Sequence, residues 1–171
     1  MITRHFQKGD AESTAVYSPC ERYRYLLTRT WGPGPERALF VMLNPSTATE
    51  YQNDPTVERC ERRARALGYG AFRVTNIFAF RATDPLVMRA EPDPIGPADD
   101  AAIVESAHWA DRIVCAWGSH GAFLDRGRQV EALLRATGRP LWHLGLTQGG
   151  QPKHPLYIGY SCQPEPWEVA A

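Results

Sequence analysis

Four segments of the chain are apolar at successive positions, not only at alternate ones. This pattern is typical of short strands covered on both faces, as in a parallel sheet between helices. Each segment ends abruptly at a polar or glycine-containing stretch, which marks the carboxyl end of the strand. The four predicted strands are 38–43, 71–80, 112–117 and 141–144.

Helical periodicity separates these segments. Asp54 can cap a first helix, Pro55 suits its first position, and Gly68 follows its last apolar residue. A second helix is predicted at 98–110, and a third begins at Ser119 and closes at Gly138. The first helix should turn its arginines mostly to solvent; they are Arg59, Arg62, Arg63 and Arg65.

This alternation of strands and helices predicts the α/β class, with a three-layer α/β/α sandwich around a four-stranded parallel central sheet. Residues 21–31 alternate tyrosine and leucine against arginine, which predicts an N-terminal antiparallel strand. Residues 1–20 show no clear period and are expected to be a loosely ordered lead-in. The length of 171 residues suits a single domain over 1–171.

Composition narrows the class of protein. The chain is 43% apolar with 11% aromatic residues, no apolar run is long enough to cross a bilayer, and residues 1–10 lack a signal peptide. A cytoplasmic monomer without a membrane partner is therefore expected. The 19 basic and 19 acidic residues balance, which disfavours tight nonspecific nucleic-acid binding but permits a local basic face.

The four cysteines and five histidines lack the spacing of a metal site, so no metal or other cofactor is predicted.

Polar residues follow the predicted strands at the points where each strand ends. Asn44 follows the first strand, Asn76 lies near the end of the second, and a turn at 118–121 follows the third. His154 lies in a long polar loop after the fourth. Because carboxyl ends of parallel strands meet at one sheet edge, these residues should converge on a single rim. The alternative for Asn44 is that it only turns the chain before Pro45.

Several short motifs carry a family resemblance. They are Leu-Asn-Pro-Ser-Thr-Ala at 43–48, Asp-Pro-Thr at 54–56, Asn-Ile-Phe-Ala-Phe-Arg-Ala-Thr-Asp-Pro at 76–85, Ala-Trp-Gly at 116–118 and His-Pro-Leu-Tyr at 154–157. With them, the chain from 22 to 157 resembles a bacterial and phage family catalogued as domain of unknown function 1643. That resemblance implies no activity.

The order of these motifs is also similar to the uracil-DNA glycosylase superfamily, which implies a three-layer α/β/α fold and cleavage at a base. In that resemblance Asn44 corresponds to the asparagine that positions the attacking water, and His154 to a histidine that contacts the base and DNA backbone. Ser46 stands where the family's motif has a closing glycine, and the cysteines are spaced wrongly for an iron-sulfur cluster. An altered site on such a fold is expected, more than uracil excision itself.

The leading hypothesis is an enzyme that hydrolyses the N-glycosidic bond of a base in nucleic acid, DNA more than RNA, or in a free nucleotide. Asn44 would hold the water, Asn76 would read the base edge, and His154 would contact the leaving base or a phosphate. Asp54 is an alternative general base, although capping is its favoured role. Other candidates are Phe78, Phe80 and Tyr51 for stacking on the base, and Arg81, Lys153, Ser119 and His120 for phosphate.

Two alternatives stay open. The same rim could be a binding module that recognises a nucleotide, a modified base or a nucleic-acid end without cutting it. The two asparagines and His154 could instead satisfy buried backbone groups and have no ligand.

Overall fold

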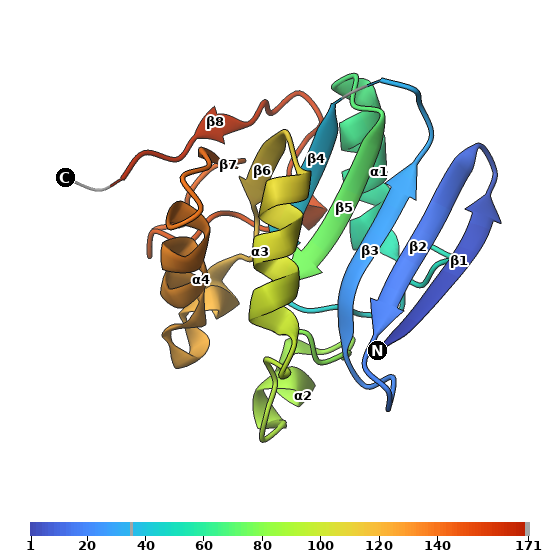
Figure 1. Ribbon diagram of the computed structural model, residues 1–171. Helices are drawn as coiled ribbons and strands as arrows, with labels where there is room; N and C mark the ends of the chain where they lie inside the picture. The colour runs from blue at the N-terminus through green and yellow to red at the C-terminus, as the bar shows by residue number, and fades with distance from the viewer. Residues whose placement is uncertain (35, 170–171) are drawn as a thin grey trace.

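The computed structural model describes residues 1–34 and 36–169 (Figure 1). Pro35 and the last two residues of the predicted domain lie outside the described residues. One eight-stranded sheet has the order β1-β2-β3-β5-β4-β6-β7-β8. The strands are β1 (Ile2–Lys8), β2 (Ala11–Tyr17), β3 (Arg24–Thr30), β4 (Arg37–Met42), β5 (Ala71–Asn76), β6 (Arg112–Cys115), β7 (Leu141–His143) and β8 (Glu165–Pro166).

The predicted fold, a sandwich on a four-stranded parallel sheet with one antiparallel strand, is wrong because the sheet is larger and mixed. Parallel pairing joins β4 to β5, β4 to β6 and β6 to β7. Antiparallel pairing joins β1 to β2, β2 to β3, β3 to β5 and β7 to β8. Residues 1–20, expected to be a loose lead-in, supply two of these antiparallel strands.

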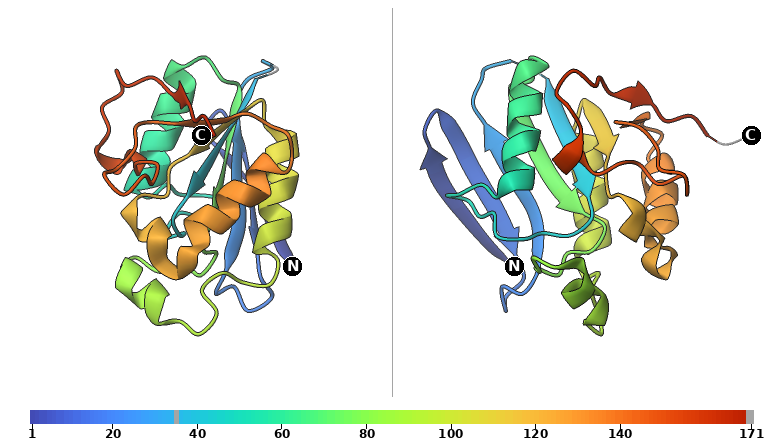
Figure 2. Two further views of the ribbon diagram at one scale, coloured as in Figure 1. Left: turned by 90° about the vertical axis from the view of Figure 1, so that its left-hand side faces the viewer. Right: turned by 180° about the vertical axis from the view of Figure 1, so that it is seen from behind.

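Helices cover the two faces of the sheet (Figure 2). Against one face, α1 packs on Phe40 and Met42 of β4, and against the other, α3 and α4 pack on Leu39 and Val41. Alternate residues of one strand therefore serve two separate cores. The helices are α1 (Pro55–Ala66), α2 (Pro85–Ala90), α3 (Asp99–Trp109) and α4 (Arg126–Arg135), with short 3-10 helices η1 (Ser119–Asp125) and η2 (Pro155–Tyr157).

The start of α1 confirms the predicted cap, because the Asp54 carboxylate accepts a hydrogen bond from the Val57 amide at 2.8 Å. The expectation of a solvated arginine face is wrong for Arg63, which is 1% exposed. Its guanidinium donates to backbone carbonyls of residues 158, 159 and 162. Arg59 donates to the carbonyls of residues 155 and 158. Helix α1 thus anchors the C-terminal segment that carries His154.

The predicted third helix is not continuous. Leu124 and Asp125, the last two residues of η1, have positive φ angles of 56° and 55°, and this non-helical backbone interrupts the helix before α4. Gly118, and not Ser119, occupies the position before η1, and no side-chain cap is formed there. The break places the turn 118–121 beside the end of β6, where it forms part of the candidate site.

Candidate functional site

The residues that follow the carboxyl ends of β4 and β6 border a cleft of about 570 Å³, here called the outer cleft. Its size falls within the range of small-molecule sites. Asn44 and His154 both line it, although the two residues are far apart in the sequence. Asp54, Ser119 and His120 line it as well. The structure therefore brings these five predicted residues together, and their chemical roles stay predictions.

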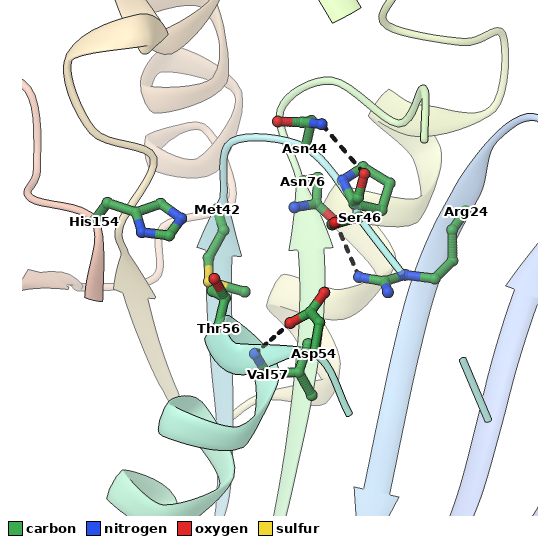
Figure 3. A pocket seen from close by; sticks show the side chains of 10 residues that line it. Arg24, Met42, Asn44, Ser46, Asp54, Thr56, Val57, Asn76 and His154 are labelled. Carbon is green, nitrogen blue, oxygen red and sulfur yellow. Dashed lines mark hydrogen bonds between the residues drawn. The ribbon is translucent and has the colours of Figure 1, made fainter. Parts of the chain in front are cut away.

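A smaller hollow of about 30 Å³, the inner recess, opens beside the outer cleft and shares Asn44, Asp54 and His154 with it. Asn76 at the end of β5 and Arg24 at the start of β3 also line it (Figure 3). A hollow of this size has room for about one or two water molecules, and its lining supplies the polar partners that such a water needs.

The Asn44 side chain has one half bound to the protein and one half turned to the recess. Its Nδ2 group donates to the carbonyl of Ala82 at 2.8 Å and to that of Pro45 at 3.2 Å. Because carbonyls only accept, these bonds fix the orientation of the amide. The Oδ1 atom lies on the side of His154 (Figure 3). Asn44 thus ties down its loop and also presents an acceptor to the recess.

Asn76 presents the opposite polarity. It is 2% exposed, and its Oδ1 atom accepts a hydrogen bond from Arg24 Nη2 at 3.5 Å. Arginine can only donate, so Oδ1 must face Arg24 and Nδ2 must face away. Figure 3 shows Nδ2 on the side of His154. The expected reader of the base edge is therefore a hydrogen-bond donor.

Arg24 is a site residue that the sequence pattern did not indicate. Alternation in its strand suggested an exposed side chain, yet Arg24 is 1% exposed. It donates to the carbonyl of Ala48 at 2.9 Å as well as to Asn76. Burial lowers the pKa of Arg24 to about 10, so the guanidinium still carries its charge at neutral pH.

His154 is held as a neutral imidazole. Its Nδ1 atom accepts a hydrogen bond from the Leu156 amide at 3.3 Å, which places the proton of the neutral ring on Nε2. Burial lowers the pKa of His154 to about 4, although the nearby Asp54 carboxylate opposes this shift. At neutral pH the ring therefore offers an N–H donor without a positive charge.

The Asp54 carboxylate is engaged by backbone groups on both oxygens. Oδ1 accepts from the Val57 amide at 2.8 Å, and Oδ2 accepts from the Ala48 amide at 3.3 Å. These bonds support the capping role of Asp54.

Trp117 forms a wall of the outer cleft and was not among the predicted site residues, although it belongs to the Ala-Trp-Gly motif. Its indole N–H donates to Gln151 Oε1 at 2.7 Å. Gly121 and Gly127 lie against the ring; a Cβ atom built on Gly121 would come within 2.1 Å of Trp117, and one on Gly127 within 2.7 Å.

The predicted stacking residues lie away from the outer cleft. Phe78 is 0% exposed and packs against Phe123 in the core, so the prediction that it stacks on a base is wrong. Phe80 contacts Tyr23 edge-on and borders a separate shallow hollow. Tyr51 is 56% exposed and lines a groove next to the outer cleft.

Of the four predicted phosphate-binding residues, two line the outer cleft and two lie outside it. Ser119 and His120 border the outer cleft. Arg81 lines the neighbouring groove together with Tyr51. Lys153 is exposed, and its side chain lies against Gly145: a Cβ atom built on that glycine would be 3.2 Å from the lysine side chain. Ser119 and His120 are therefore the members of this set that share the outer cleft with His154.

Within residues 1–34 and 36–169, no cluster of three or more histidine, cysteine, aspartate or glutamate side chains is arranged to hold a metal ion. None of the helices in this part of the chain combines the length and apolar character that a bilayer crossing requires.

Comparison with known proteins identifies a family but no activity. No curated protein and no solved structure matched the chain. The expected resemblance to uracil-DNA glycosylases is thus without support from these comparisons. The model of one family, described as "Protein of unknown function (DUF1643)", matches residues 24–156. This match spans the site from Arg24 to His154, and the chain belongs to that family.

Proposed function

We propose that the outer cleft binds a nucleobase and that the protein hydrolyses the N-glycosidic bond joining that base to its sugar. The observation that carries the proposal is the inner recess, where Asn44 Oδ1, Asn76 Nδ2 and the neutral His154 ring face a volume of about 30 Å³. One acceptor and two uncharged donors suit a water molecule beside the carbonyl edge of a base.

The chemistry follows from these polarities. The bond from the sugar C1′ atom to the base nitrogen breaks, and the base leaves with the bonding electrons. The Nε2–H group of His154 donates a hydrogen bond to the carbonyl oxygen on which negative charge develops. Asn44 Oδ1 accepts a hydrogen bond from the water whose oxygen bonds to C1′. The proton that this water releases passes to the departed base and neutralises its charge.

Release of free base tests the proposal. Purified protein is incubated with oligonucleotides and nucleotides containing uracil, hypoxanthine or a modified base, and products are identified by mass spectrometry. Asn44→Ala and His154→Ala should each lower the rate by about 100-fold or more, the usual effect of removing a group that stabilises developing charge. Gln129→Ala, an exposed position on α4, is the matched control. Unchanged rates in both cleft variants would remove both assignments.

One observation favours a second function, a module that binds a base or nucleotide without cutting it. Both oxygens of Asp54 accept backbone hydrogen bonds, so the carboxylate that lines the recess already holds the backbone in place. In that case a nucleoside should raise the melting temperature while mass spectrometry finds no product. Turnover would exclude this second function.

A further inference from the structure

A side groove of about 480 Å³ adjoins the outer cleft. Ser46, Ala82 and Thr83 line both hollows, so the two are continuous along the protein surface. The Ser46 and Thr83 hydroxyls lie 3.4 Å apart at this junction. A ligand longer than one nucleotide could therefore extend from the outer cleft into the side groove.

An exposed aromatic pair stands at the side groove. Tyr51 lines it and is 56% exposed, and Phe6 of β1 is 48% exposed. Their ring centroids lie 6.1 Å apart with an interplanar angle of 71°. The edge contact with Phe6 supports the tyrosine ring from the side and leaves much of Tyr51 open to solvent. Rings of this kind are the stacking surfaces that proteins offer to unpaired bases.

The charge of the side groove suits a phosphate. Arg81 lines it, and no carboxylate occurs among its described lining residues. The guanidinium of Arg81 is held in place, since Nη1 donates to the carbonyl of Glu21 at 3.0 Å and the group lies 5.1 Å from the centre of the Tyr17 ring. A fixed arginine next to serine and threonine hydroxyls resembles the contacts by which proteins position a nucleic-acid backbone.

We propose that the side groove holds the single strand of nucleic acid that flanks the base in the outer cleft. A neighbouring base stacks on Tyr51, and the intervening phosphate binds Arg81 and the Ser46 and Thr83 hydroxyls. This proposal rests on the proposed function, because it assumes that the outer cleft takes a base. It names a single strand of nucleic acid, and not a free nucleotide, as the ligand. An unpaired strand fits because its base faces are free to stack, whereas those of a duplex are covered.

Binding of short strands tests this proposal. Fluorescence anisotropy compares fluorescein-labelled hexamers of deoxythymidylate and ribothymidylate, which differ only in the sugar, with thymidine 5′-monophosphate as an unlabelled competitor. The hexanucleotide should bind more tightly than the monophosphate. Tyr51→Ala should weaken strand binding by about tenfold, as loss of one stacking contact does, and Arg81→Gln should weaken it and reduce its salt dependence. The preferred hexanucleotide identifies the sugar.

The matched control is Leu86→Ala, which truncates another exposed side chain (63% exposed) on α2 and should leave strand binding unchanged. Monophosphate binding should be unchanged by Tyr51→Ala and by Leu86→Ala, because a single nucleotide has no neighbouring base to stack on Tyr51. Equal affinity for hexanucleotide and monophosphate, or strand binding insensitive to both groove substitutions, overturns the side-groove proposal. If the protein still releases free base when the side-groove proposal fails, the proposed function is retained. Strand binding that depends on Tyr51 without base release supports the groove and rejects hydrolysis.

Discussion

Arg24 Nη2 donates to Asn76 Oδ1 across 3.5 Å, and this contact decides which half of the amide faces the inner recess. Without Arg24, the side chain of Asn76 could rotate and offer either an acceptor or a donor. With the buried guanidinium in place, the recess receives the amide N–H group. The polarity of the site therefore originates in a buried arginine on a neighbouring strand.

Asn76→Asp should remove this donor and keep the shape of the side chain. The new carboxylate would pair with Arg24 and turn its other oxygen toward the recess, where it would repel a base carbonyl. We expect base or nucleoside affinity to fall by about tenfold or more, which corresponds to the loss of a hydrogen bond and an unpaired acceptor. Isothermal titration calorimetry measures it, with Gln129→Glu on α4 as the control. Equal affinity in the variant and the wild type would show that Asn76 does not contact the ligand.

Asp54→Asn separates capping from general-base catalysis. An asparagine still accepts a hydrogen bond from the Val57 amide but loses the one from the buried Ala48 amide, so the free energy of unfolding should fall by about 1–3 kcal/mol. Base release should change only a few-fold if Asp54 is a cap, whereas loss of a general base typically costs about 100-fold or more. Denaturant unfolding and a rate assay on one preparation measure both. A stable variant with its rate lowered 100-fold would assign the base to Asp54.

The stability of the protein should fall in acid partly because of His154. Burial lowers its pKa to about 4 in the folded state, against about 6.5 in an unfolded chain. Between these values the unfolded state binds a proton that the folded state does not, so the free energy of unfolding decreases as pH falls from about 6.5 to about 4. The decrease from this group is at most roughly 3 kcal/mol.

The comparison of wild type with His154→Gln isolates that contribution. Burial also lowers the pKa of His143, which acts in the same direction in both proteins. Urea unfolding at several pH values should show a shallower loss of stability in the variant. Parallel curves for the two proteins would mean that His154 titrates normally.

Arg63→Met should release the segment that carries His154. Arg63 is buried and donates to three backbone carbonyls of that segment. Leaving these acceptors unpaired should lower the free energy of unfolding by about 2–4 kcal/mol. Limited proteolysis should then cut after residue 157 sooner than in the wild type. Arg62→Met, which removes an exposed arginine paired with Glu58, should change stability by less than about 1 kcal/mol.

The interior strands could be predicted from the sequence because both of their faces are apolar. Residues 38–43 correspond to β4 (Arg37–Met42), and 112–117 to β6 (Arg112–Cys115). The second strand was predicted to reach residue 80 but ends at Asn76. Beyond that point Ile77 and Phe78 bond to the end of β4, and Ala79 bonds to Ile95. The chain leaves the sheet ladder while remaining buried, which an apolar pattern cannot distinguish from a longer strand.

The antiparallel strands β1 and β2 could not be predicted from the pattern of apolar residues. Strand β1 is largely exposed along its length, and β2 alternates mainly small residues such as Ala11, Ser13 and Ala15. Neither leaves a strong apolar period. Arg24 was missed for another reason: its partners, Ala48 and Asn76, are distant in the sequence. Long-range hydrogen bonds, not local preference, make burial of that charge tolerable.

The antiparallel pairing of β3 with β5 makes β3 part of the candidate site. Leu27 pairs with Val74. Because the two strands run in opposite directions, Arg24 at the start of β3 lies beside the carboxyl end of β5. Inserting a single residue into β3 after Tyr25 would shift the register by one position, so that Tyr25 would take the place of the Arg24 guanidinium next to Asn76. Variation in length should therefore be tolerated at the tip between β1 and β2, and rejected between Arg24 and Leu27.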